Sequence, residues 1–164
     1  MTDLKINKCL QKKKDDSPNW SIYTYTSNIK NAGTDAKVYL QIFGSKANTG
    51  KLNLEKKTKN ENPFETGKCD RFDKRLPDFG RPTKIKIGHD NSGSFAGWHL
   101  DKVVIENNIT GEKFVFPCNR WLAKDEADHK IELELYLNGN PAEGKQSKRK
   151  KKNKKLKKMF LFDD

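Results

Sequence analysis

The sequence lacks the features that define several large classes of protein. No run of apolar residues approaches the roughly 18 to 20 that a membrane-spanning helix needs. The N-terminus, residues 1–16, contains no hydrophobic block of the kind found in a signal peptide. We therefore expect no transmembrane helix and no secretory signal. Without a signal, the sequon Asn108-Ile109-Thr110 has no access to the glycosylation machinery.

Cysteine and histidine are scarce, and catalytic motifs are missing. The three cysteines, Cys9, Cys69 and Cys118, are odd in number and lack C-x-x-C spacing, so we interpret them as free thiols in a reducing compartment. The three histidines are not accompanied by a G-x-S-x-G elbow, an H-E-x-x-H motif or a phosphate-binding G-x-x-x-x-G-K loop. These absences predict that the protein is not an enzyme, with no catalytic residue and no small-molecule substrate.

The chain has 164 residues, the size of one domain, and its positive charge is concentrated at the ends. Lys and Arg number 34 against 22 Asp and Glu, a net charge of +12, yet residues 17–142 hold 19 basic against 16 acidic side chains, a net of only +3. We therefore divide the chain into a basic N-terminal arm (1–18), a globular region (19–140) and a Lys-rich C-terminal tail with an apolar end (141–164). Because the chain starts with Met, we expect a native full-length product.

Short runs of alternating apolar and polar residues, bounded by Gly, Asn, Asp and Pro, fill the globular region. No amphipathic helix of ten or more residues is indicated. The four prolines Pro63, Pro77, Pro82 and Pro117 fall between the expected strands or at their ends, where a missing N–H does no harm. The predicted fold class is all-β, an eight-stranded antiparallel β-sandwich of two four-stranded sheets. The eight strands are expected over residues 20–25, 36–42, 51–54, 70–74, 83–89, 98–106, 112–116 and 130–137.

Four segments go beyond generic strand patterning. Residues 31–44 place an A-G-T-D-A turn before a strand, and residues 85–105 combine a strand, an H-D-N-x-G loop and a strand similar to G-W-x-L-x-x-V-x-V. Residues 114–122 contain F-x-C-x-x-W-L, and Ile131-Glu-Leu-Glu-Leu135 is similar to a closing strand. In this order the segments resemble the PLAT domain, also called the lipoxygenase homology or LH2 domain, over roughly residues 19–137. The pattern is closest to that of proteins with tandem copies of this domain.

The resemblance implies a non-catalytic accessory module, since PLAT domains attach enzymes and receptors to membranes or to partner proteins. Some members bind Ca²⁺ in loops at one end of the sandwich, and by position the calcium residues here would be Asn31, Gly33, Asp35 and Asp90. Calcium takes six to eight oxygens including several carboxylates, whereas only two of these residues are acids. We favour turn-capping by Asp35 and Asp90, with a positive φ at Gly33. No cofactor is predicted beyond the calcium alternative.

The aromatic residues divide into predicted core and predicted contacts. Trp98 and Trp121 are large enough to fill the space between two sheets about 10 Å apart, so we expect both in the core. Membrane insertion by PLAT domains usually needs exposed apolar side chains at loop tips, and the candidates are Phe95, Phe43 and Phe79. Burying one Phe ring yields about 2 to 3 kcal/mol, which is too little for stable anchoring alone.

The C-terminal tail combines a basic block with an apolar end. Nine of its ten cations are Lys, which act as point charges on an anionic surface and give affinity without specificity. The four apolar residues that follow, Met159, Phe160, Leu161 and Phe162, are interpreted as an anchor for a partner. The alternative is a solvating end or a nuclear-localisation signal. The basic residues are Lys145, Lys148, Arg149, Lys150, Lys151, Lys152, Lys154, Lys155, Lys157 and Lys158.

Two binding functions fit these observations. In the first, the protein is a structural or adaptor component that docks through its sandwich and basic tail onto an acidic protein assembly such as a cytoskeletal filament. In the second, it is a peripheral membrane module that binds anionic lipid through the loop around Phe95 and the tail. We favour the first, because a loop-tip aromatic cluster and good calcium ligands are missing. Nucleic acid ranks third, since no exposed stacking pair is indicated. The expected location is the cytoplasm, in association with the cytoskeleton or a cilium.

Overall fold

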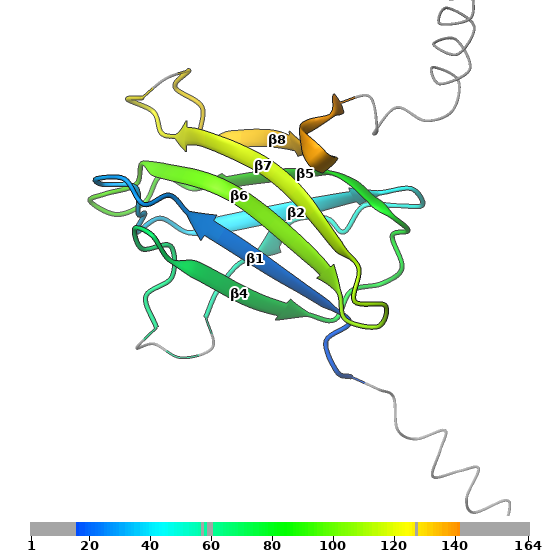
Figure 1. Cartoon of the computed structure of the whole chain (residues 1–164). Coiled ribbons are helices and arrows are strands. Elements are labelled where there is room, and N and C mark those ends of the chain that lie inside the picture. Colours follow the sequence, from blue (N-terminus) through cyan, green and yellow to red (C-terminus); the bar gives the residue numbers. More distant parts are fainter. Residues whose placement is uncertain (1–15, 57, 59–60, 127, 142–164) are drawn as a thin grey trace, which may run out of the picture.

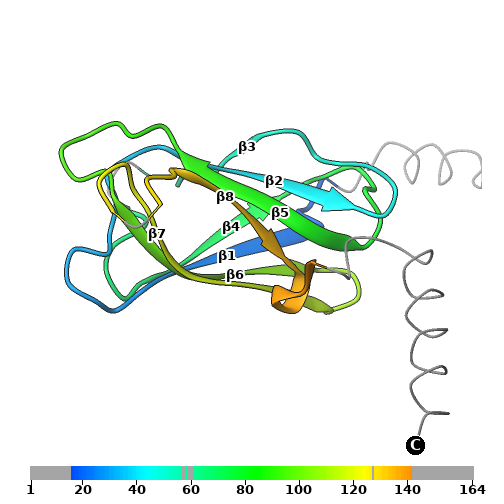
Figure 2. The ribbon, with the colours of Figure 1, turned by 90° about the horizontal axis from the view of Figure 1, so that it is seen from above.

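The chain folds into two packed antiparallel sheets, and the computed structural model describes residues 16–56, 58, 61–126 and 128–141 (Figure 1). One sheet has the strand order β4-β1-β6-β7 and the other β3-β2-β5-β8. The two sheets form two layers when seen from above (Figure 2). The predicted fold class is confirmed. The elements are β1 (Trp20–Thr26), β2 (Val38–Gly44), β3 (Leu52–Asn53), β4 (Cys69–Lys74), β5 (Pro82–His89), β6 (Trp98–Asn107), β7 (Lys113–Leu122), β8 (Glu132–Tyr136) and the short 3₁₀ turn η1 (Leu137–Gly139).

Each predicted strand overlaps an observed one, and the largest difference is at β7. This strand continues beyond Pro117 to Leu122, so the prediction that Pro117 ends a strand is wrong. Pro117 pairs with Lys102 of β6 next to a register shift between Leu100 and Lys102. β7 is also the edge strand of its sheet. Edge strands and bulges are the positions where a sheet tolerates the missing N–H of proline.

The core lies where the inward faces of the two sheets meet. Along β2, β4 and β8 buried residues alternate with more exposed ones, as the two-residue period of a strand requires. Full burial of one aliphatic side chain contributes about 1.5 to 3 kcal/mol, so this layer is the main source of stability. The fully buried aliphatic side chains include Ile22, Leu40, Ile42, Ile85, Ile87, Leu100, Ile105 and Leu122.

The two tryptophans expected in the core differ in position. Trp98 is completely buried, and its indole Nε1 donates a hydrogen bond to Thr26 Oγ1 at 2.9 Å, which confirms the prediction for this residue. Trp121 is only half-buried, so the core prediction is wrong for it. The reason is the alternation of side chains along β7, where the adjacent Leu122 takes the inward position.

Phe79 was expected as an exposed contact, and that expectation is also wrong. Its side chain is 1% exposed, and its ring lies 4.8 Å from that of Trp20, centroid to centroid. Gly44 makes this packing possible, because a Cβ at that position would lie 2.1 Å from the Phe79 carbonyl oxygen. Phe79 therefore closes the core at the end of the sandwich where β4 connects to β5.

Two further expectations from the sequence can be compared with the structure. Cys69 and Cys118 are free thiols, as predicted, and Cys9 lies outside the described residues. Burial raises the pKa of the Cys118 thiol to about 11. Within the described ranges, no helix has the length and apolar character to cross a membrane.

Replacing Phe79 by Ala should lower the free energy of unfolding by about 3 to 5 kcal/mol, because it empties a site at the end of the core. Phe43→Ala is the matched control, since that ring is only half-buried, with the ammonium of Lys84 4.6 Å from its centroid. The control should lose about 1 kcal/mol or less. Urea denaturation of both variants measures the difference, and equal losses would contradict the assignment of Phe79 to the core.

Candidate functional site

Four connections meet at one end of the sandwich, on the left in Figure 1. They are residues 27–37 between β1 and β2, residues 64–68 before β4, residues 90–97 between β5 and β6, and residues 123–131 between β7 and β8. We call these residues the loop end. All four predicted calcium residues and Phe95 lie on it, whereas Phe43 lies on β2. The sequence-predicted residues of the tail, 145–162, lie outside the described residues.

Asp90 caps the turn that follows β5. Its Oδ1 accepts hydrogen bonds from the backbone N–H of Lys37 at 3.0 Å, and from the backbone N–H and hydroxyl of Ser92 at 3.0 and 2.5 Å. The hydrogen bond from the Ser92 hydroxyl is the main cause that lowers the Asp90 pKa to about 2, and the backbone donors act in the same direction. The carboxylate therefore ties residues 90–92 to the start of β2, which agrees with turn-capping.

His89, the first residue of the H-D-N motif, is buried and joins this turn to the opposite sheet. The N–H of Asn91 donates to His89 Nδ1 at 3.0 Å, so Nδ1 carries no proton and Nε2 donates to the carbonyl of Leu122 at 2.7 Å. Burial lowers the His89 pKa, which favours this neutral form. Asn91 and Gly93 have positive φ angles of 59° and 84°, so the motif supplies both the anchor and the turn.

In the A-G-T-D-A loop, Thr34 rather than Asp35 makes the closing hydrogen bonds. Its hydroxyl donates to the carbonyl of Ala96 at 2.7 Å and accepts from the N–H of Ala36 at 3.1 Å. The Asp35 carboxylate makes no hydrogen bond or ion pair with the described residues, so its predicted capping role is wrong. The sequence reasoning missed Thr34, although a Thr in a tight polar turn commonly bonds to nearby backbone.

The predicted positive φ also belongs to another residue of this loop. Asn31 has a φ of 62°, whereas Gly33 does not have a positive φ. Gly33 is required by close packing instead, because a Cβ there would lie 2.9 Å from the carbonyl oxygen of Phe64. The same Phe64 oxygen accepts a hydrogen bond from the N–H of Thr34 at 3.0 Å. The loop is thus fixed against residues 64–66.

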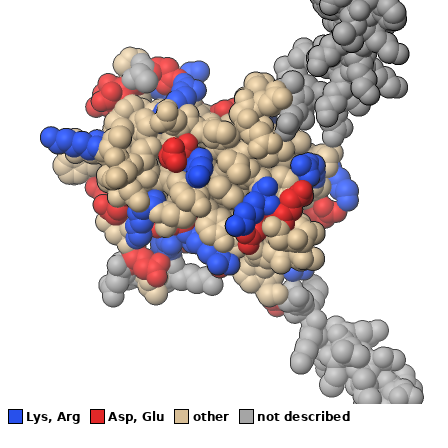
Figure 3. Space-filling view, in the orientation of Figure 1, with Lys and Arg blue, Asp and Glu red and all other residues tan. Residues whose placement is uncertain are grey.

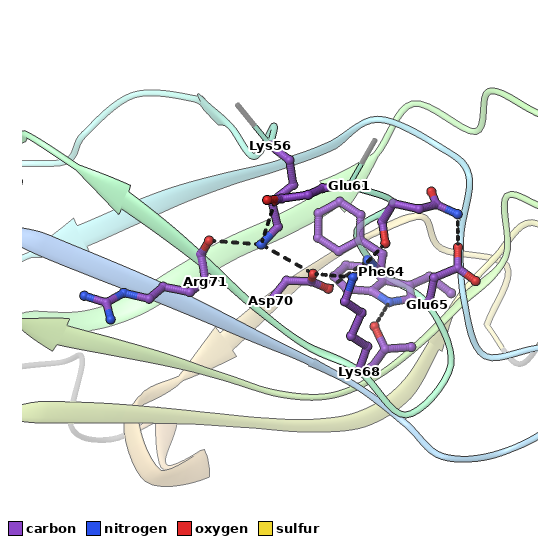
Figure 4. A network of polar contacts seen from close by, with 10 residues as sticks. Lys56, Glu61, Phe64, Glu65, Lys68, Asp70 and Arg71 are labelled. Atoms are coloured by element: carbon purple, nitrogen blue, oxygen red, sulfur yellow. Dashed lines mark hydrogen bonds and ion pairs between the residues drawn. The ribbon is translucent and has the colours of Figure 1, made fainter. Parts of the chain in front are cut away.

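Phe64 is held by a buried carboxylate (Figure 4). Asp70, which is fully buried, accepts a hydrogen bond on Oδ2 from the N–H of Phe64 at 2.8 Å. The ammonium groups of Lys56 and Lys68 lie 3.6 and 3.7 Å from its Oδ1. The Phe64 ring packs in the core against the rings of Phe72 and Trp98, with centroids at 5.6 and 5.2 Å.

The loop end encloses an open hollow of about 490 Å³ with an aromatic wall and an acidic rim. Phe95, the most exposed aromatic candidate, is 73% exposed, and Trp121 forms part of the wall. The carboxylates are those of Asp35, Glu65, Asp125 and Glu126, and none of the described Lys or Arg residues lines the hollow. Five lysines belong to the same loops but lie outside the lining, namely Lys30, Lys37, Lys68, Lys124 and Lys130.

The residues that the resemblance assigns to calcium do not form a cage. Asn31, Gly33 and Asp35 line the hollow, but Asp90 does not, and its Oδ1 already accepts three hydrogen bonds. Among the described residues, no group of three or more His, Cys, Asp or Glu side chains is arranged to hold a metal ion. This donor set falls short of the several carboxylates that calcium prefers.

Two other hollows carry fewer features of a binding site. One of about 660 Å³ lies between the edge strands β3 and β4, where the ammonium groups of Lys56 and Lys74 donate to the carbonyls of Arg71 and Asn53. Another of about 610 Å³ lies at the end opposite the loop end, beside Trp20. The loop end is therefore the best candidate site.

Comparison with known proteins agrees with this fold. The family described as PLAT/LH2 domain matches residues 20–138. Lipoxygenase homology domain-containing protein 1 of Mus musculus is 43% identical over 120 residues, which cover 73% of this chain and 6% of the relative. Allene oxide synthase-lipoxygenase protein of Plexaura homomalla is 30% identical over 126 residues, which cover 75% of this chain and 12% of the relative. The chain thus spans a small fraction of the relatives it matches.

A solved structure gives the same picture. Coral 8R-lipoxygenase, whose crystal structure is described in terms of calcium activation through a C2-like domain, superposes with a TM-score of 0.62 and 26% identity. The match covers 72% of this chain and 16% of that one. The shared part is the β-sandwich described above.

Replacing Asp90 by Asn should reduce the loss of folding stability that occurs when the pH falls from 6 to 2. The folded pKa of about 2 lies below the ordinary value of 3.8, so the ionised carboxylate contributes stability above about pH 4, and this contribution is lost as the pH falls towards 2. Thermal unfolding between pH 2 and 6 should show a smaller acid loss for Asp90→Asn than for the unmodified chain. Asp35→Asn is the control, and a loss in the Asp90 variant equal to that of the unmodified chain would contradict the capping role.

Proposed function

The chain belongs to the PLAT/LH2 domain family, and on that premise we propose that it is a non-enzymatic interaction module that docks onto protein. Its match to the relatives is confined to this accessory domain, whose sandwich offers no catalytic constellation among the described residues. His99 Nδ1 lies 2.6 Å from Ser27 Oγ, but Ser27 is only 9% exposed and no described carboxylate is hydrogen-bonded to His99. This pair therefore gives a substrate no access to the hydroxyl.

The observation that carries the proposal is the chemistry around Phe95. Phe95 is 73% exposed at a loop tip, and Trp121 lines the same hollow, so the two aromatic residues together offer an apolar surface that suits a contact with a partner. Four carboxylates line the hollow beside the ring. These carboxylates need a partner that brings cations together with an apolar contact, and a protein surface can supply both at this end while its acidic regions meet the tail. The loop end thus favours protein over anionic lipid.

The tail supplies a second point of attachment in this proposal. The face of the sandwich formed by β4, β1, β6 and β7 has acidic and basic side chains interspersed, with no large patch of one sign (Figure 3). Most of the net positive charge is therefore carried by the ends of the chain, with ten cations in residues 145–158. We propose that the tail binds an acidic protein assembly such as a cytoskeletal filament, which would place the protein in the cytoplasm, at the cytoskeleton or in a cilium. The alternative acceptor is an anionic membrane.

Co-sedimentation with microtubules and with anionic liposomes tests the proposal. The full chain should pellet with the filament at physiological salt, and a chain ending at Ala142 should not, because ten basic side chains are lost. Phe95→Asp should weaken pelleting with the filament without abolishing it, because the contact at the loop end is lost while the tail remains. Liposome binding that survives physiological salt and is abolished by Phe95→Asp would instead establish the membrane alternative and overturn the protein-docking proposal.

A further inference from the structure

The hollow at the loop end has the composition of a site for a basic, aromatic-containing peptide. Phe95 and Trp121 provide its apolar surface, and the imidazole of His99 supports Trp121 edge-on, with ring centroids 5.0 Å apart. Elsewhere in the described part of the chain, Lys or Arg lies over the rings of six aromatic residues, for example Lys51 at 3.9 Å from the Tyr39 centroid. Within those same residues, neither Phe95 nor Trp121 has such a cation. Two rings suited to cation–π contact are thus left open.

The carboxylates at the rim also have no cationic partner among the described residues. The carboxylates of Asp35, Asp125 and Glu126 make no hydrogen bond or ion pair with the described residues. Glu65 accepts only a neutral hydrogen bond, from the Asn62 side chain at 2.6 Å. An occupant that brings ammonium groups would pair with these acids and lie over the rings at the same time. Calcium would satisfy the acids but would leave the aromatic wall unused.

The surface is held in place before any partner arrives. The N–H of Asp35 donates to the Phe95 carbonyl at 3.0 Å, and the Thr34 hydroxyl donates to the adjacent Ala96 carbonyl at 2.7 Å. Gly93 packs against Asp35, because a Cβ there would lie 3.1 Å from the Asp35 Cβ. Because the two hydrogen bonds fix the backbone at residues 95 and 96, and Gly93 packs against Asp35 on the other side of Phe95, binding needs little further ordering of the loop.

The sequence itself contains a segment with the complementary composition. Residues 145–158 carry ten cations, and two Phe, one Leu and one Met follow directly. Lysines match the acidic rim, and the Phe rings match the wall formed by Phe95 and Trp121. The tail is therefore a candidate occupant on two independent grounds, charge and apolar contact.

The direction in which the chain leaves favours a tail from a second copy. β8 starts at the loop end and runs away from it, and the described chain ends at Pro141, just after η1. Gly139 lies against Pro117, five residues before the end of β7, so the chain leaves about 17 Å of strand away from the loop end. A tail that reached its own hollow would have to run back along the sandwich, whereas the tail of a second copy needs no such path.

We propose that the aromatic and acidic hollow of one copy binds the Lys-rich tail of another, so that the protein associates head to tail. This inference rests on the proposed function, and it gives the tail a second acidic surface besides the assembly, the loop end of another copy. Such a contact joins two different surfaces of the chain, so an assembly that does not close into a ring keeps one hollow and one tail free. It can therefore extend beyond a dimer.

Sedimentation velocity of the full chain over a wide range of concentrations, at low and at high salt, tests the proposal. The unmodified chain should associate more strongly as its concentration rises, and salt should weaken the association. Two variants of the full chain should each weaken it by roughly tenfold or more. The hollow variant carries Asp35→Asn, Asp125→Asn and Glu126→Gln, and the tail variant carries Lys150→Gln, Lys151→Gln, Lys152→Gln, Lys154→Gln and Lys155→Gln.

Mixing the two variants gives the sharpest result. The tail variant retains an intact hollow and the hollow variant retains an intact tail, so an equimolar mixture should form a heterodimer at concentrations where each variant alone stays monomeric. A charge-matched control in which three acids outside the hollow are neutralised should associate like the unmodified chain. Circular dichroism should confirm that all variants are folded. The control changes are Glu55→Gln, Glu112→Gln and Glu134→Gln.

Several outcomes would overturn the inference. They are an unmodified chain that stays monomeric at every concentration, a hollow variant that associates as strongly as the unmodified chain, and a mixture of the two variants that does not associate. A fourth is a hollow variant whose only change is a different sedimentation coefficient of the monomer, which would indicate that each tail binds the hollow of its own copy. If microtubule pelleting that depends on the tail persists in any of these cases, the proposed function stands and only the head-to-tail contact falls. If pelleting is also absent, both fail.

Discussion

A buried carboxylate, that of Asp70, holds the loop end together. It accepts the N–H of Phe64, a residue whose φ of 66° is unfavourable for a bulky side chain by about 1 to 2 kcal/mol. The same interaction positions the Phe64 carbonyl, which accepts the N–H of Thr34. Thr34 in turn bonds to Ala96, next to Phe95. A single buried acid on β4 is thus connected through two residues to a loop on the opposite side of the sandwich end.

Burying the Asp70 carboxylate and holding Phe64 at a positive φ both cost free energy, which other contacts offset. A buried charge needs partners of opposite charge, and the ammonium groups of Lys56 and Lys68 lie 3.6 and 3.7 Å from the carboxylate (Figure 4). The Phe64 ring, packed between Phe72 and Trp98, offsets the strain in its own backbone. Because the apolar anchor and the ionic anchor act on the same residue, contacts within the chain itself fix Phe64 and the loops bonded to it.

The sequence predicted the sandwich well, because alternation and turn residues are local signals. The strand positions and the burial of Trp98 follow from the two-residue period, and the turn at Asp90 follows from its capping chemistry. Errors arose where contacts between distant segments decide the outcome. Phe79 is buried because its ring packs against Trp20 of β1 and Gly44 of β2 leaves room for it. Trp121 lies outside the core because β7 continues past Pro117 and the adjacent Leu122 takes the inward position.

The site was predictable only in part for the same reason. Phe95 could be recognised from its place in a polar, Gly-containing loop, and the structure places it among carboxylates from three other connections of the chain. No pattern within one segment reveals that Asp35, Glu65 and Asp125 share a rim. Their convergence matters because the sandwich itself is nearly neutral, so its few unpaired acids set the local field beside Phe95. A fold that gathers acids and aromatic rings at one end, and whose last strand, β8, runs away from that end before the basic tail begins, gives one chain two complementary surfaces.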